Sequence, residues 1–217
     1  MRRAIDISHW EGTYSTNTPP NWAGAVLDGV EVGVMKAMEK RTADSMFEYN
    51  WRAMERQGLT RGGYHFWNPT DTNYEADLFC RTLLGKDTTL EFLPIVDFEP
   101  SLTVYTTRIP GVDIKLKAFL DRVELRTGIK PLIYTGKPYW ERHFPVTPTW
   151  LINYKLWLAA YPNRISTIKN QWDLTAYSYQ IPTLPRGWLL PQLYMWQFSD
   201  KGIIPGFSGG VDLNYIY

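Results

Sequence analysis

The apolar residues of this chain gather in short runs that recur along nearly its whole length. Between the runs lie polar segments and helical patterns, so the runs are typical of buried strands rather than of one continuous helix. They predict eight strands, at Ala4–Ile7, Val32–Lys36, Gly62–Phe66, Leu93–Phe98, Pro131–Tyr134, Leu156–Ala160, Tyr194–Phe198 and Val211–Tyr215.

Two segments between these runs carry apolar residues at helical spacing. The clearer one is Asp44–Gln57, where we expect Asp44 to cap the start and Gly58 to end the helix. The second runs from about Ile114 to Thr127 and stops at Gly128. Both segments therefore predict helices that follow strands.

Alternation of strand and helix favours a parallel sheet, and the absence of an obvious edge strand favours its closure into a barrel. The later part is less regular, because Tyr161–Pro191 contains prolines at 162, 182, 185 and 191 and no convincing amphipathic helix. We therefore predict an α/β fold, a single modified TIM-like (β/α) barrel with eight strands and irregular last three β/α units. Residues 1–217 form one domain in this interpretation.

The charge balance narrows the range of partners. With 23 Lys and Arg against 22 Asp and Glu, the formal charge is +1, which gives no reason to expect nucleic acid or an anionic membrane. The chain starts directly with a strand, without the apolar stretch of a secretory signal, and no apolar run approaches membrane-spanning length. We expect no signal peptide, no membrane partner and a monomer.

Cysteine and aromatic content add two further expectations. Cys80 is the only cysteine, so an intramolecular disulfide is impossible, and its helical surroundings predict a buried, inert thiol. The chain has 10 Trp, 14 Tyr and 9 Phe, together 15% of its residues. Trp and Tyr combine a flat apolar face with a polar edge, which suits sugar rings, although most of them should be ordinary packing.

The most informative motif is Asp97-Phe98-Glu99, which follows the apolar run Leu93–Val96. Side chains alternate along a strand, so Asp97 and Glu99 share a face. Two carboxyl groups held so close cannot both ionise freely, so one keeps a proton near neutral pH, as a general acid for glycosidic cleavage requires. The alternative is that the acids simply mark the point where a strand meets water.

Polar and aromatic residues also follow most of the other predicted strands. In a barrel of this kind the carboxyl ends of the strands meet at one mouth, where the chemistry takes place. We therefore expect carboxylates and aromatic rings to gather there. Asp6 could instead cap a turn with Ser8, Asp212 could cap the last strand, and the aromatic residues could serve packing alone. His65 is expected to be a core histidine without a role in proton transfer.

Taken together, six blocks of this sequence resemble glycoside hydrolase family 25, the Chalaropsis-type lysozymes or N-acetylmuramidases. The blocks are Asp6-Ile7-Ser8-His9-Trp10, Tyr64-His65-Phe66, Asp97-Phe98-Glu99, Leu156-Trp157 with Tyr161, Trp196-Gln197 and Val211-Asp212-Leu213-Asn214. The resemblance spans Ile5 to Asn214 and implies a modified barrel that cleaves the β-1,4 bond between N-acetylmuramic acid and N-acetylglucosamine in bacterial peptidoglycan. It implies no metal, and we expect no cofactor.

The resemblance also implies roles for particular residues. Glu99 would be the general acid, with Asp97 beside it, and Asp6 and Asp212 would complete the acidic group. Asp97 is expected to stay ionised and to stabilise the oxocarbenium-like transition state or orient the substrate's acetamido substituent. A direct nucleophile and an inverting base stay open as alternatives, and the acetamido route with net retention is favoured. The expected substrate-binding residues are Tyr64, Tyr134, Trp157, Tyr161, Trp196 and Gln197.

Two further segments lie near the mouth in this interpretation. The family commonly has Gly after the Glu of Lys36-Ala37-Met38-Glu39, whereas this chain has Lys40, which adds a cation near the mouth and puts the local turn in doubt. The segment Ser101–Val112, with Tyr105 and Arg108, is expected to be a loop that lines the groove.

The absence of a leader and of a separate wall-binding domain suggests a bacteriophage endolysin that reaches the wall through a holin, or an excised catalytic domain. The alternatives in function are a non-catalytic carbohydrate-binding barrel and a hydrolase of another N-acetylated polymer such as chitin.

Overall fold

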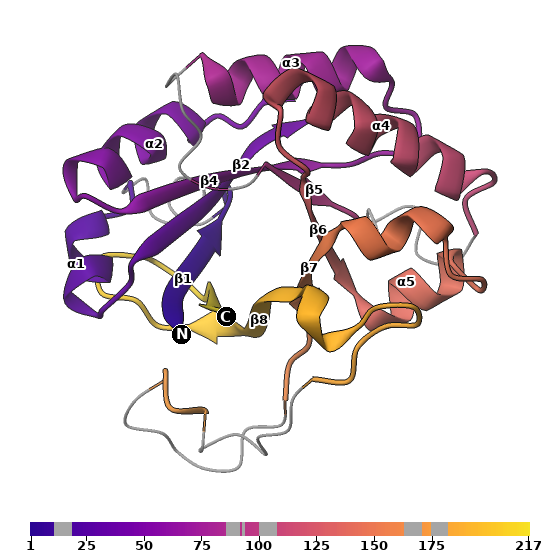
Figure 1. Cartoon of the computed structure of the whole chain (residues 1–217). Coiled ribbons are helices and arrows are strands. Elements are labelled where there is room, and N and C mark those ends of the chain that lie inside the picture. The colour runs from indigo at the N-terminus through magenta and orange to yellow at the C-terminus, as the bar shows by residue number, and fades with distance from the viewer. Residues whose placement is uncertain (11–18, 86–91, 93, 100–107, 163–170, 175–181) are drawn as a thin grey trace.

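The computed structural model describes residues 1–10, 19–85, 92, 94–99, 108–162, 171–174 and 182–217. Figure 1 looks along the axis of a closed barrel whose strands surround the centre and whose helices lie outside. The strands are β1 (Arg2–Ile7), β2 (Val32–Glu39), β3 (Thr42–Ala43), β4 (Thr60–Phe66), β5 (Ile95–Asp97), β6 (Leu132–Gly136), β7 (Lys155–Ala159), β8 (Leu193–Gly202) and β9 (Val211–Ile216). The eight predicted strands are thus all present.

Strand pairing closes the barrel. β1 pairs with β2 on one side and with β9 on the other, and the sequence of neighbours β9-β8-β7-β6-β5-β4-β2 completes the circle. The pairings from β1 through β2 and β4 to β8 are parallel, as predicted. β9 departs from the prediction because it runs antiparallel to both β8 and β1. The fold is a modified TIM-like barrel with a mixed sheet.

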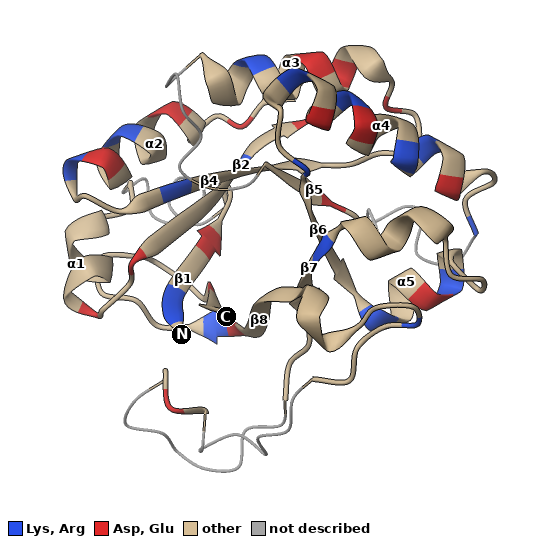
Figure 2. Ribbon diagram, in the orientation of Figure 1, with Lys and Arg blue, Asp and Glu red and all other residues tan. Residues whose placement is uncertain are grey.

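The helices cover most of the barrel's circumference. They are α1 (Trp22–Leu27), α2 (Phe47–Arg56), α3 (Asn73–Leu84), α4 (Val112–Thr127) and α5 (Lys137–His143), with 3-10 turns at η1 (Thr149–Asn153) and η3 (Leu190–Gln192). In Figure 1 α1 to α5 follow one another around the outside. Figure 2 shows that Lys, Arg, Asp and Glu intermix on the outer faces of α2, α3 and α4, as expected for solvated helix faces.

The prediction was wrong for the start of one helix and correct for the end of the other. α2 begins at Phe47 rather than at Asp44, which lies in the preceding turn and accepts a hydrogen bond from the backbone N–H of Met46 at 2.9 Å. The N-cap prediction for Asp44 was therefore wrong by two residues, because Asp also favours turns. α4 ends at Gly128 in a left-handed conformation, as predicted.

The last part of the barrel is irregular, as predicted. α5 and η1 join β6 to β7, and β8 and β9 pair directly as antiparallel neighbours. Within Tyr161–Pro191 the described residues form no α-helix. Prolines explain this, because they remove backbone donors and clash with the preceding turn of a helix.

Alternating side chains divide the core into two layers. One layer fills the barrel interior and includes Val34, Ile95, Leu132 and Met195. The larger one fills the space between the sheet and the helices, where Phe98 contacts the rings of the α5 segment. Apolar burial on both faces of the strands explains why their sequences read as continuous apolar runs.

Cys80 and His65 both lie in the environments predicted for them. Cys80 is buried in α3, and burial raises the pKa of its thiol to about 12, so it stays protonated and inert. His65 is fully buried, with its Nε2 2.7 Å from Asp71 Oδ2 and its ring 4.9 Å from that of Phe119. No helix among the described residues is both long and apolar enough to cross a membrane.

The turn that the sequence left in doubt forms a tight hairpin. Lys40 and Arg41 connect β2 to β3, and Lys40 adopts a left-handed backbone with φ 51°. Two-residue hairpin loops need positive φ angles, which cost a non-glycine residue roughly 1 kcal/mol. Among the described residues Lys40 is the only non-glycine with such an angle.

We predict that Phe119→Ala lowers the free energy of unfolding by about 3–5 kcal/mol, because it empties a packed position between α4 and the barrel. Leu125→Ala, on the exposed side of the same helix, should change it by less than about 0.5 kcal/mol. Urea unfolding followed by circular dichroism measures both. Equal losses in the two variants would contradict this account of the core.

Candidate functional site

Strand alternation points one set of side chains into the barrel at its mouth. Asp6, Asp97 and Asp212 come from β1, β5 and β9, and Glu99 follows β5 by two residues. Together with three aromatic residues they surround a cavity of about 60 Å³, which we call the acid cavity. Its lining residues are Asp6, Tyr64, Asp97, Glu99, Tyr134, Trp157 and Asp212. All seven are among the predicted site residues.

Asp212 reaches the mouth for a different reason from the one predicted. It is the second residue of β9, not a residue at its carboxyl end. Because β9 is antiparallel to its neighbours, its beginning lies at the rim where the parallel strands end, and Asp212 pairs in register with Asp6. The correct placement therefore followed from the motif, while the parallel topology assumed for it was wrong.

Two amide side chains hold Asp6 in place. Gln197 Nε2 donates to Asp6 Oδ2 at 2.9 Å and to Asp212 Oδ2 at 3.1 Å. Asn214 Nδ2 donates to the same Asp6 oxygen at 2.6 Å. Gln197 and Asn214 are both buried, so each unmet hydrogen bond would be costly. Asn214 was noted at the strand end but given no role; its i+2 spacing from Asp212 indicates the shared face.

The same amides fix the aromatic wall. The hydroxyl groups of Tyr134 and Tyr161 donate to Gln197 Oε1 at 2.8 and 2.6 Å. Trp157 donates through its indole N–H to Asn214 Oδ1 at 2.8 Å, and its ring lies 4.6 Å from that of Tyr134. Gln197 thus forms hydrogen bonds with both the acids and the tyrosines. Tyr161 is connected to the site by its bond to Gln197 and does not line the acid cavity.

Burial makes the carboxyl group of Glu99 a weaker acid than usual. Loss of solvent around its carboxyl group, followed by the negative charge of Asp6, raises its pKa from 4.5 to about 7, against the opposing charge of Lys36. Glu99 therefore retains a proton over much of the range below neutral pH. A carboxyl group of this kind can act as a general acid.

Asp97 differs from its expected state. Burial, and then the charges of Glu99 and Asp6, also raise its pKa well above the usual value, so its environment does not favour the ionised form that we predicted. Its Oδ1 is buried and accepts no hydrogen bond from any described residue. The two carboxyl groups cannot both ionise easily, so the pair holds at least one proton near neutral pH.

One predicted sugar contact lies elsewhere. Trp196 points to the opposite face of β8 from Gln197, packs near Phe198 in the outer layer, and donates its indole N–H to the carbonyl of Ala160 at 2.7 Å. Its prediction as a substrate-binding residue is therefore wrong in placement. A motif that joins two neighbouring residues cannot put both on one face of a strand.

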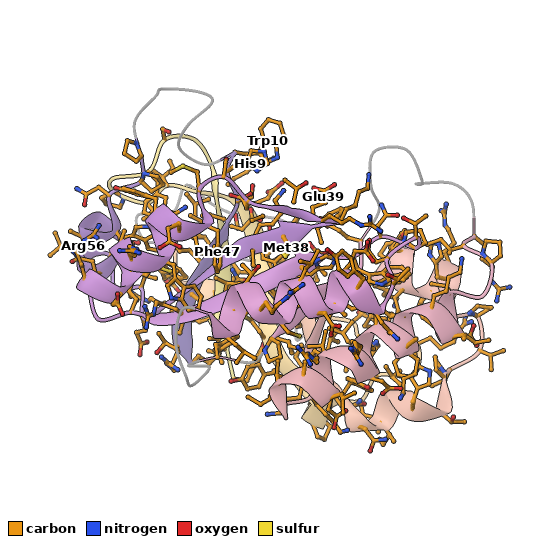
Figure 3. The ribbon with its side chains drawn as sticks, turned by 90° about the horizontal axis from the view of Figure 1, so that it is seen from above. His9, Trp10, Met38, Glu39, Phe47 and Arg56 are labelled. Carbon is orange, nitrogen blue, oxygen red and sulfur yellow. The ribbon has the colours of Figure 1, made fainter. Side chains whose placement is uncertain are left out.

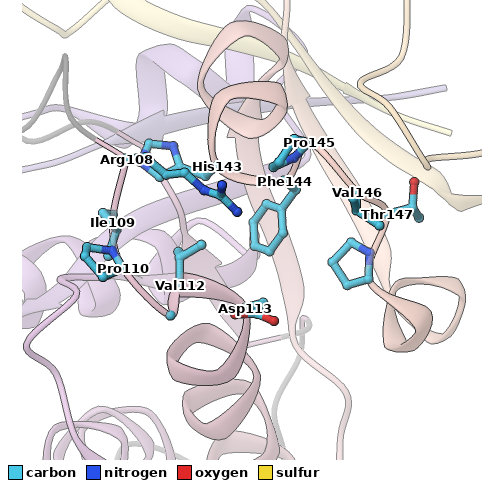
Figure 4. A pocket seen from close by; sticks show the side chains of 12 residues that line it. Arg108, Ile109, Pro110, Val112, Asp113, His143, Phe144, Pro145, Val146 and Thr147 are labelled. Carbon is cyan, nitrogen blue, oxygen red and sulfur yellow. The ribbon is translucent and has the colours of Figure 1, made fainter.

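A second cavity, of about 490 Å³, lies between the start of α4 and the end of α5 (Figure 4). Arg108, Val112 and His143 are among its lining residues, and none of its lining residues also lines the acid cavity. Of the segment expected to line the groove, Ser101–Thr107 with Tyr105 lies outside the described residues. Within the described residues, no group of three His, Cys, Asp or Glu could hold a metal ion.

Comparison with known proteins agrees with this geometry. The family model of Glycosyl hydrolases family 25 matches residues 5–207. Lysozyme M1 of Streptomyces globisporus is 28% identical, over 98% of this chain and 66% of its own length. The N,O-diacetylmuramidase of Arthroderma benhamiae is 27% identical, over 88% of this chain and 78% of its own.

Among solved structures, a lysozyme from Streptomyces coelicolor superposes with a TM-score of 0.76 at 23% identity, covering 99% of this chain and 91% of that one. A muramidase from Acremonium alcalophilum gives 0.73 at 23% identity, covering 100% and 94%. These likenesses show a shared fold. Several curated relatives are longer, and the chain spans about two thirds of their length.

A closed barrel with buried carboxyl groups and aromatic rings at its mouth, in a chain with these relatives, is that of a glycoside hydrolase. The chain belongs to glycosyl hydrolases family 25.

We predict that Glu99→Gln gains stability relative to the wild type as pH rises from about 4.5 to about 7. A folded-state pKa above the unfolded value means that the folded protein binds more protons in this window, so wild-type stability falls as pH rises. One pKa unit is worth about 1.4 kcal/mol, so the relative gain should reach at most roughly 3 kcal/mol. Urea unfolding at pH 4 and pH 7.5 measures it, and parallel pH profiles would contradict the shifted pKa.

Proposed function

We propose that this chain hydrolyses the β-1,4 bond between N-acetylmuramic acid and N-acetylglucosamine in bacterial peptidoglycan. The observation that carries the proposal is the raised pKa of Glu99, to about 7, inside a cavity built from three further acids and three aromatic rings. The names of Lysozyme M1 and of the N,O-diacetylmuramidase agree with this substrate class.

Glu99 acts first as the general acid. It gives its proton to the glycosidic oxygen while the bond from that oxygen to the sugar C1 breaks, and positive charge develops on the ring. The resulting carboxylate then takes a proton from the water that attacks C1. A group with a pKa near neutrality suits both steps, since it can lose and regain its proton at little cost.

Asp97 acts on the 2-acetamido group of the substrate. Its buried Oδ1 has no hydrogen-bond partner in the part of the chain that the structure describes, and the acetamido N–H would supply one. Hydrogen bonding to a carboxylate favours the ionised form, so the substrate itself would move the shared proton to Glu99. The acetamido oxygen can then attack C1 as the bond breaks, which gives net retention once water opens the cyclic intermediate.

The size of the acid cavity supports this role. At about 60 Å³ it is far smaller than the roughly 300–1,000 Å³ of sites that enclose a whole small ligand, so it suits a substituent rather than a whole sugar ring. Tyr134 and Trp157 provide apolar walls for the acetamido methyl group, and Asp6 and Asp212 supply negative charge next to the developing cation. The sugar ring itself would lie above the cavity.

The place of action follows from the substrate. The chain would act on the cell wall as a monomer and would need neither metal nor cofactor. Two similar solved structures are a CTP1L endolysin and the catalytic domain of endolysin ply40 from a Listeria bacteriophage. Release from a host cytoplasm through a holin-type pore is part of this proposal.

We predict that Glu99→Gln abolishes clearing of purified bacterial cell walls, with a loss of about 100-fold or more, because the amide keeps the shape but cannot deliver a proton. Circular dichroism checks that the variant folds. Glu124→Gln, which removes a carboxylate from the outer surface of α4, should clear walls like the wild type. Full activity of a folded Glu99→Gln would discard this mechanism, and an inactive wild type would favour a non-catalytic carbohydrate-binding barrel.

We also predict that every new reducing end released from peptidoglycan lies on N-acetylmuramic acid. Borohydride reduction of the products followed by mass spectrometry identifies the reduced sugar. Chitin oligosaccharides incubated in parallel should remain largely intact. Reduced N-acetylglucosamine, or cleavage of chitin alone, would remove the muramidase assignment.

A further inference from the structure

A larger cavity of about 360 Å³ opens at the end of β2, around the hairpin to β3. His9, Lys36, Glu39, Lys40 and Asp44 are among its lining residues, and we call it the lysine cavity. Seen from the side of the barrel in Figure 3, His9, Trp10 and Glu39 lie along one edge of the molecule. Its volume falls in the range of sites that bind small molecules, roughly 300–1,000 Å³.

Lys36 connects this cavity to the acid cavity. Its side chain is buried, with its Nζ 3.6 Å from Glu39 Oε2 and 3.9 Å from Asp44 Oδ2. Its positive charge also lowers the pKa of both Glu99 and Asp97, so the ammonium group lies within electrostatic reach of the acids. Lys36 also pairs in register with Tyr64, which lines the acid cavity, so a ligand in the lysine cavity would adjoin a substrate bound at the acids.

Both carboxylates of the lysine cavity, Asp44 and Glu39, already have partners within the protein. Asp44 accepts hydrogen bonds from the backbone N–H of His9 at 3.1 Å and of Met46 at 2.9 Å, and its Oδ2 lies 2.7 Å from His9 Nδ1. Glu39 pairs with Lys36. Lys40, by contrast, is exposed and forms no ion pair with any described residue. The two Lys and two carboxylates of the lining balance in formal charge, but Lys40 is the cation left to pair with a ligand.

Lys40 has a backbone conformation that usually favours glycine. Its left-handed conformation would suit glycine without strain, yet a long cationic side chain stands there, at the rim of a cavity. Strained positions of this kind often occur at ligand sites. Trp10, which is 61% exposed and whose ring lies 4.5 Å from that of His9, adds an apolar surface beside the cavity.

We propose that the lysine cavity receives a carboxylate-bearing peptide attached to the glycan, and that Lys40 pairs with its carboxylate. The proposal rests on the proposed function, since peptidoglycan carries such peptides on its sugars and chitin carries none. Lys40 is then a specificity residue that makes the enzyme prefer glycan strands with peptides. It has no part in proton transfer.

The test compares two substrates, soluble glycan strands with their peptides and the same strands freed of peptides by an amidase. Lys40→Gly should reduce the preference for peptide-bearing strands, as the ratio of kcat/KM values, about fivefold, mainly through KM. Lys40→Arg should keep the preference. Arg41→Gln is the matched control, because it removes one positive charge from the same turn while its guanidinium faces Glu75, 2.6 Å away, outside the cavity.

A second measurement does not depend on turnover. The isolated stem peptide, titrated by calorimetry into Glu99→Gln, should bind about fivefold more weakly once Lys40→Gly is added. An unchanged preference and unchanged peptide affinity in Lys40→Gly would overturn the inference, as would an equal effect of Arg41→Gln. A wild type inert toward both strands, with the peptide still bound through Lys40, would contradict only the proposed function.

Discussion

The antiparallel insertion of β9 between β8 and β1 is the constraint on which the site depends. It closes the barrel and brings the beginning of β9, rather than its end, to the mouth. Asp212 and Asn214 thereby come beside Asp6, although more than 200 residues separate them along the chain. A parallel last strand would carry Asp212 to the opposite end of the barrel.

The closed barrel lets the protein bury carboxyl groups that would otherwise repel one another. The amides of Gln197 and Asn214 fix Asp6 in one orientation, and the ammonium of Lys36 partly offsets the negative potential. For the pair Asp97 and Glu99, burial and the charge of Asp6 outweigh the opposing charge of Lys36. Their raised pKa values represent an energetic cost to the folded state at neutral pH, which is the usual trade between stability and a reactive site.

Local patterns in the sequence predicted most of this arrangement, because strand alternation and motif spacing are short-range properties. They placed seven residues correctly around one cavity. They failed where long-range geometry decides. The direction of β9 depends on pairing with β1, the outward position of Trp196 depends on which face of β8 is inside, and the protonation of Asp97 depends on burial by neighbours distant in sequence. The start of α2 failed for a local reason, since Asp44 suits a turn as well as a cap.

The small volume of the acid cavity also determines how a polymer can approach. Under the proposed function, a pocket that takes a substituent but not a ring would leave the sugar chain lying across the mouth. A strand held in this way needs no free terminus, so cuts would fall in the interior of long strands. An intact, cross-linked meshwork would then be open to attack at any exposed stretch, and a few cuts would be enough to weaken it.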